Sequence, residues 1–265
     1  MTGALAAGAL LIAAVAGARG TWSPCGLSMI SAINPLSERS RGNRYWLTAV
    51  WFVLGSVLGG VALGAAGGVL AVLLRPLAAH RGVALWIAVL ACLVTLAADR
   101  RLGGFQLPLH PRQVNELWLT RYRRWLYAAG FGVQIGVGFA TSIMTAATYL
   151  VVALAALTGS PALALATGTV FGLVRGLAVL LSARCRTSVA LQQLHLRLST
   201  LEPVSLRAVM VVEALLAGGL GYAAAGALPG LGALLLAGLI LLAGEPRLAA
   251  RGRLASGAGP RAARG

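Results

Sequence analysis

The chain of 265 residues contains no lysine and only six acidic residues, so its positive charge comes entirely from 22 arginines. Charged residues make up 11% of the sequence, whereas a soluble domain carries about 25%. This deficit, together with several apolar runs of about 20 residues or more, excludes a water-soluble globular protein. We therefore expect an all-α, polytopic integral membrane protein whose surroundings are the lipid bilayer.

The high net charge of +16 does not indicate a nucleic-acid partner. The arginines lie between the apolar runs and do not form a continuous basic face with interleaved aromatic residues. Basic residues between spans indicate orientation instead, because cytoplasmic loops are enriched in them. If the N-terminus lies outside the cell, most of the arginines fall in segments on the cytoplasmic side. The sequence thus predicts a multi-pass protein of the cytoplasmic membrane with a cytoplasmic C-terminus.

The apolar runs predict six or seven transmembrane helices. The first span is broken, since Arg19 interrupts it and Pro24 cannot continue a helix. The last run is too long for one helix, and Pro229 between Gly226 and Gly230 offers a turn. The predicted spans are residues 4–33, 46–74, 83–98, 125–157, 161–183 and 208–244, the last of which is one span or two.

The two halves of the chain share a weak pattern. Segments 23–32 and 138–147 are both small, hydroxyl-rich and methionine-bearing, and each is followed by a pair of glycines four residues apart. Three spans in each half would make residues 1–98 and 125–226 an inverted repeat, followed by a C-terminal span. Small residues at this spacing also occur in any tightly packed helix bundle, which is the alternative interpretation.

The transmembrane domain is expected to cover residues 1–244. Residues 116–125 carry aromatic residues and arginines at helical spacing, which predicts a helix along the membrane interface. The tail, residues 245–265, is rich in glycine, alanine and arginine and lacks aromatic residues. Such a composition predicts a disordered basic tail.

The three cysteines form no CxxC pair and no cluster with histidine, so we expect no metal site. Cys25 is the informative one because it follows Pro24 at a helix break. A helix that restarts there directs the positive end of its dipole toward the sulfur, which favours a thiolate. The alternative is an inert, buried cysteine beside an ordinary kink. Cys92, midway along the third span, is either a packing residue or a disulfide partner.

Charged residues within spans are costly and mark paired or functional positions. Arg175 and Glu213 lie at matching depths in the fifth and sixth spans, which predicts an ion pair, unless each side chain snorkels to the interface. Arg19 has no acidic partner in its own helix, so it must face protein, water or an anionic solute. No catalytic triad, paired-carboxylate site or cofactor motif assigns an enzyme class.

Ser23-Pro24-Cys25, in a broken first span followed by a two-half membrane domain, resembles the CcdA/DsbD family of membrane thiol–disulfide electron carriers, within the LysE-type transporter superfamily. The resemblance implies a redox role for Cys25 and a second cysteine in the fourth span. That place offers Thr141 or Ser142 and no cysteine. Either another thiol serves as the partner, or the scaffold is used for something else.

Two main functions therefore remain open, beside a membrane scaffold for another assembly. The first is an electron carrier that moves reducing equivalents across the membrane, as in cytochrome c biogenesis, with a thioredoxin-like protein as partner. The second is a small-solute exporter without redox chemistry that uses Arg19, Arg175 and the broken helices.

Overall fold

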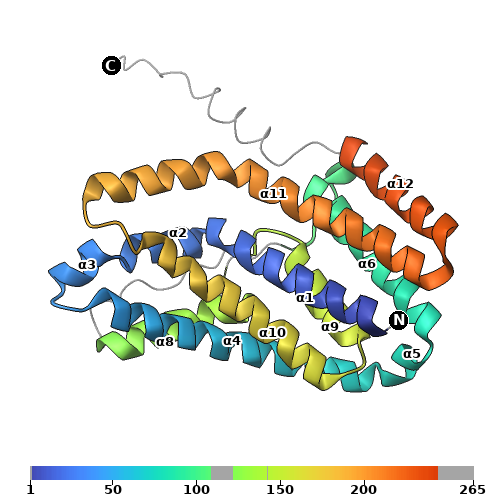
Figure 1. Ribbon diagram of the computed structural model, residues 1–265, viewed down its shortest axis with the longest axis horizontal. Coiled ribbons are helices and arrows are strands. Elements are labelled where there is room, and N and C mark those ends of the chain that lie inside the picture. The colour runs from blue at the N-terminus through green and yellow to red at the C-terminus, as the bar shows by residue number, and fades with distance from the viewer. Residues whose placement is uncertain (1, 109–121, 142, 244–265) are drawn as a thin grey trace, which may run out of the picture.

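A computed structural model describes residues 2–108, 122–141 and 143–243, and every regular element in these ranges is a helix. Figure 1 shows their arrangement as a bundle. The elements are α1 (Thr2–Arg19), η1 (Gly20–Trp22), α2 (Pro24–Ala32), α3 (Pro35–Ser40), α4 (Tyr45–Leu73), α5 (Arg75–Ala79), α6 (Arg81–Arg100), η2 (Leu102–Gly104), α8 (Arg124–Val137), α9 (Ala147–Leu157), α10 (Pro161–Leu177), η3 (Ala178–Ser182), α11 (Ser188–Ala225) and α12 (Ala227–Ala243).

Five helical stretches in the described residues are long and apolar enough to cross a bilayer, and α9 and α12 are shorter apolar helices. The five are Gly3–Trp22, Tyr45–Leu73, Arg81–Arg100, Pro161–Ser182 and Ser188–Ala225. Many of their leucines, valines and tryptophans point outward and are exposed, as expected where lipid rather than water surrounds the protein. The predicted all-α, polytopic membrane bundle is confirmed.

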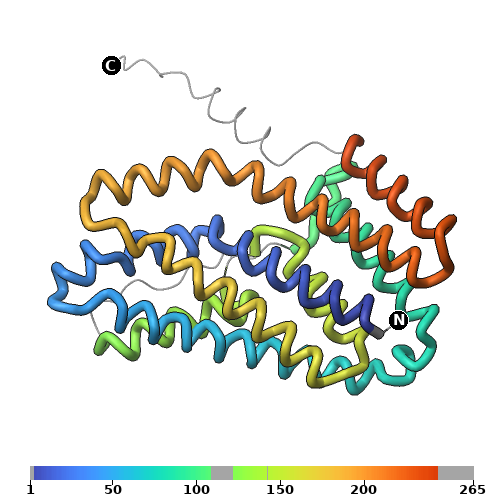
Figure 2. Tube along the Cα trace, in the orientation of Figure 1, coloured from blue at the N-terminus to red at the C-terminus, as the bar shows by residue number. Residues whose placement is uncertain are grey.

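The long helices alternate in direction between two ends of the bundle, which Figures 1 and 2 show at left and right. One end, here called the α3 end, holds α3 and the beginnings of α8 and α11. The other, the α5 end, holds the N-terminus, α5 and the connection from α11 to α12. Helices α1, α6 and α10 run toward the α3 end, whereas α4, the α8–α9 pair and α11 run away from it.

Helix α4 lies at the centre of the packing because glycines line two of its sides. Gly55 and Gly59 face the backbone of α8, while Gly60 and Gly64 face the backbone of α10. Close backbone approach through small residues is the usual way in which membrane helices associate. Ser56 reinforces this contact, since its Oγ donates a hydrogen bond of 2.7 Å to a backbone carbonyl of α10.

Three boundaries differ from those expected. The predicted span 125–157 is two helices, α8 and α9, and residues 138–141 and 143–146 between them form no regular helix. Helix α11 begins at Ser188, about twenty residues before the predicted start, and carries Pro203 in its interior. The turn before α12 lies at Gly226, whose φ is +93°, and Pro229 belongs to the first turn of the new helix. The predicted tail and most of the predicted interfacial helix lie outside the described residues.

Candidate functional site

The first helix break presents Cys25 at the start of α2. Helix α1 ends at Arg19, one turn of 3-10 helix follows, and Pro24 occupies the first position of α2. Ser23 is the N-cap, because its Oγ accepts a hydrogen bond of 3.0 Å from the N–H of Gly26. Cys25 therefore lies in the first helical turn, as expected from the sequence, and its side chain is only 1% exposed.

The second helix break, residues 138–146, separates α8 from α9. Gly138 ends α8 with a φ of +76°, a conformation that favours glycine. Thr141 is fully buried, and its Oγ1 donates to the carbonyl of Gly138 at 3.2 Å. At the other end of the break, the carboxylate of Asp99 accepts hydrogen bonds from Thr145 Oγ1 and from the N–H of Ala146, the latter at 2.8 Å. Ser142, the other hydroxyl expected here, lies outside the described residues.

Arg175, at the end of α10, connects the two breaks. Its Nη2 donates a hydrogen bond of 3.3 Å to Thr141 Oγ1, and its guanidinium carbon lies 5.5 Å from the ring centre of Phe171. On the other side the guanidinium packs against Gly20, where an added Cβ would lie 2.5 Å from Nε. Cys25 is within electrostatic range of the same guanidinium. The structure thus brings the predicted residues Cys25, Thr141 and Arg175 together.

The predicted ion pair between Arg175 and Glu213 is wrong. Ion pairs that the structure does form join Arg19 to Glu202 and Arg41 to Glu38, whereas the guanidinium of Arg175 donates to Thr141. Glu213 is buried on the side of α11 that packs against α6, where it lies within electrostatic range of Cys92. The two residues were matched by depth alone, but Arg175 points toward the helix breaks.

Arg19 is buried and has partners on α11. Its Nη2 lies 3.7 Å from a carboxylate oxygen of Glu202, and its Nη1 donates to Ser205 Oγ at 3.1 Å. Next to it, Trp22 donates its indole N–H to the carbonyl of Leu198 at 2.7 Å. Arg19 was expected to face protein, water or an anionic solute, and the structure shows that it faces protein. Helix α11 holds the first break through these contacts.

The three cysteines form no disulfide in the structure. Cys25 belongs to a buried cluster with residues of α2, α4 and α8, whereas Cys92 belongs to a separate cluster with residues of α1, α9 and α11. Cys185 is buried in the segment before α11, and burial raises the pKa of its thiol. The structure therefore does not bring the predicted candidate partner Cys92 to Cys25.

A polar cluster at the α3 end was missed by the sequence analysis. The fully buried carboxylate of Glu38 accepts hydrogen bonds from Thr48 Oγ1 at 2.6 Å, from the Tyr127 hydroxyl at 2.8 Å and from Arg41 Nη1 at 2.8 Å. These contacts join α3, α4 and α8. The carboxylate is satisfied by three donors of this chain, which indicates a structural role.

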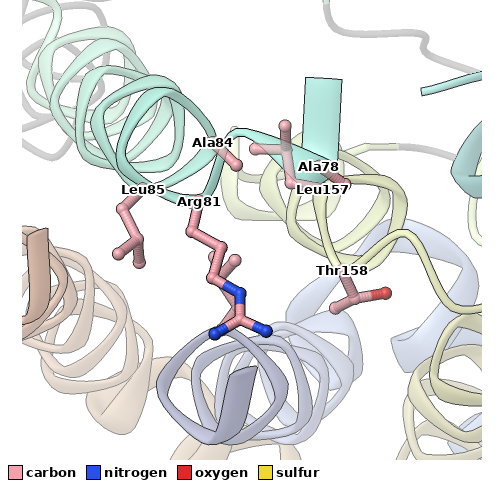
Figure 3. A pocket seen from close by; sticks show the side chains of 7 residues that line it. Ala78, Arg81, Ala84, Leu85, Leu157 and Thr158 are labelled. Atoms are coloured by element: carbon pink, nitrogen blue, oxygen red, sulfur yellow. The ribbon is translucent and has the colours of Figure 1, made fainter. Parts of the chain in front are cut away.

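A mainly apolar cavity lies at the α5 end, away from the breaks. The guanidinium of Arg81 extends beside it (Figure 3). The lining residues are Leu5, Ala78, Arg81, Ala84, Leu85, Leu157 and Thr158. None of these residues belongs to either break, so this cavity is separate from the cluster around Arg175.

The chain is similar to methylamine utilization proteins named MauF. It is 32% identical to MauF of Paracoccus versutus over 176 residues, 64% of this chain and 62% of the relative. It is 31% identical to MauF of Methylophilus methylotrophus over 177 residues, 64% of this chain and 60% of the relative. It is also 31% identical to MauF of Paracoccus denitrificans over 185 residues, 64% of this chain and 62% of the relative.

The matched region thus spans about three fifths of the length of these relatives. No family model matches the chain. No solved structure matches it either.

Proposed function

We propose that this chain is a membrane protein of methylamine utilization in which Cys25 carries out thiol–disulfide exchange. Similarity to the MauF proteins supports the process, as their name states it. The position of Cys25 in the first helix break, within electrostatic range of Arg175, which contacts both breaks, supports the chemistry.

The main support for thiol–disulfide exchange at Cys25 is the buried positive charge of Arg175. A guanidinium stays protonated in proteins, and a buried charge is costly unless an opposite charge compensates it. No carboxylate of the described residues pairs with Arg175, and its Nε has no hydrogen-bond partner among them. Cys25 lies within electrostatic range of this guanidinium. Its position in the first turn of α2 places its sulfur near the positive end of a helix dipole.

The exchange reaction needs a thiol from outside this chain. The Cys25 thiolate attacks one sulfur of a partner's disulfide, a mixed disulfide forms, and the other partner sulfur leaves as a thiolate. One thiol of a donor dithiol then attacks the Cys25 sulfur and releases the acceptor as a dithiol. The donor's second thiol attacks this new mixed disulfide, which releases Cys25 as a thiolate and leaves the donor as a disulfide, so that two electrons pass from donor to acceptor. Because Cys92 lies in another cluster, we assign both partner thiols to other molecules, of which a thioredoxin-like protein is one candidate.

The arrangement of the helices supports an inverted repeat of residues 1–98 and 125–226. Each half contributes one broken span and two further long helices, and corresponding helices run in opposite directions (Figure 1). We propose that the α3 end faces the cytoplasm, because basic residues accumulate on that side of membranes. Exposed arginines at this end are Arg39, Arg41, Arg44, Arg123, Arg184, Arg186 and Arg197. The N-terminus then lies outside.

Solute export has less support, because the arginines on which it would depend have internal contacts. Arg19 is engaged by Glu202 and Ser205. Arg175 is enclosed between Gly20, Thr141 and Phe171.

The test is to trap the oxidation state of Cys25 in membranes. Membranes quenched with acid are treated with a mass-adding maleimide before and after reduction, and the wild type is compared with Cys25→Ser and with the matched control Cys92→Ser. We expect a disulfide that is lost in Cys25→Ser and retained in Cys92→Ser. A Cys25 that remains a thiol under every condition would refute the proposed chemistry.

A further inference from the structure

Each helix break is held by a carboxylate from a helix of the opposite half. Asp99, at the end of α6, accepts from Thr145 and from the N–H of Ala146 where α9 begins. Glu202, on α11, pairs with Arg19 where α1 ends. Helix α6 of the N-terminal half thus holds the second break. Helix α11 of the C-terminal half holds the first.

The two anchors suit the helix ends that they hold. Asp99 is fully buried, and its negative charge lies at the positive end of α9. Thr145 relays the contact into the helix, because its Oγ1 also accepts from the N–H of Ala147 at 3.2 Å. At the other break, the positive charge of Arg19 lies at the negative end of α1. The dipole of α9 therefore favours Asp99 itself, and the dipole of α1 favours Arg19, the residue that Glu202 holds.

We propose that Asp99 and Glu202 are positioning residues that hold the two breaks against Arg175 and thereby keep Cys25 enclosed. This inference rests on the proposed use of Cys25 in exchange. Cys25 is 1% exposed in the closed arrangement, so a partner sulfur reaches it only when the breaks separate. Loss of either anchor raises the population in which they are apart.

The experiment measures the rate at which N-ethylmaleimide alkylates Cys25 in membranes containing the full chain. All variants are made in a background protein that carries both Cys92→Ser and Cys185→Ser, so that Cys25 is its only thiol. We expect Asp99→Ala and Glu202→Ala each to raise the alkylation rate of Cys25 about fivefold or more. This is the change in the population of the open state that follows from losing one hydrogen bond or ion pair. Asp99→Asn still offers an oxygen that accepts from the N–H of Ala146. Its alkylation rate should therefore stay within about twofold of that of the background protein.

Thr167→Val is the matched control, because Thr167 is buried but its hydrogen bond stays within α10 and contacts neither break, and it lies outside the cluster that holds Cys25. Its rate should equal that of the background. Unchanged rates in Asp99→Ala and Glu202→Ala would overturn the proposal, as would equal acceleration in Thr167→Val or no rescue by Asp99→Asn. If the rates respond as expected but Cys25 never forms a disulfide, the positioning role stands and the proposed exchange reaction fails.

Discussion

Replacing Gly20 by alanine tests whether Arg175 needs the space at the first helix break. The new Cβ would lie 2.5 Å from Nε and 3.0 Å from Cζ of Arg175. An ordinary contact of about 3.5 Å requires a shift of about 1 Å. The hydrogen bond from Nη2 to Thr141, already 3.3 Å long, does not tolerate such a shift. The substitution should therefore separate Arg175 from the second break.

The expected cost combines two overlapping effects. Overpacking a buried site costs about 1–3 kcal/mol, and losing a hydrogen bond from a charged group costs about 1.5–3 kcal/mol. We expect Gly20→Ala to lower the free energy of unfolding by about 2–3 kcal/mol, since both effects arise from one displacement.

Unfolding by denaturant in detergent micelles measures this change. Gly219→Ala is the control, because a Cβ there meets no atom within 4 Å and alanine favours helix over glycine by about 1 kcal/mol. The control should be as stable as the wild type or more so. A Gly20→Ala variant that unfolds like the control would refute the close packing of Arg175 against the first break.

Three further predictions follow from the geometry. Thr141→Val should lower the free energy of unfolding by about 1.5–3 kcal/mol, because it removes the acceptor of the hydrogen bond from Arg175 Nη2; a variant that unfolds like the wild type would contradict this. Gly172→Ala should destabilise the protein by about 1–3 kcal/mol, since its Cβ would lie 2.8 Å from a glycine Cα of α4, and the same unfolding assay checks it. Burial raises the pKa of the Cys185 thiol, so its alkylation by maleimide should be slow at pH 7. The alkylation rate should go on rising at pH values where the rate of an exposed cysteine no longer changes. A dependence of rate on pH equal to that of an exposed cysteine would contradict this.

The sequence was sufficient to predict the first break but not the second. Pro24 removes a backbone donor, so a kink in an apolar run is visible from residue types alone. The second break contains no proline, and it begins at Gly138, one of many glycines in this chain. The likeness of segments 23–32 and 138–147, and the resemblance to a family with a functional residue in the fourth span, both pointed to that place, but neither predicted a break in the helix. Its backbone path depends on Asp99, which comes from another helix.

The charge partners could not be predicted, because depth along a helix does not give the direction in which a side chain points. Arg175 and Glu213 matched in depth but face different neighbours. Glu202, the partner of Arg19, lay outside the predicted sixth span because α11 begins at Ser188. A helix whose first half is polar gives a weak signal, so its contacts appear only in the folded chain.

The most direct test of the central claim is growth on methylamine of a Paracoccus denitrificans strain that lacks its own MauF and expresses this chain. We predict growth with the wild-type chain and with Cys92→Ser, and loss of growth with Cys25→Ser at an equal amount of protein in the membrane. Growth with Cys25→Ser equal to that of the wild type would contradict the assignment of the chemistry to Cys25. Failure of the wild-type chain itself to support growth would contradict the assignment to methylamine utilization.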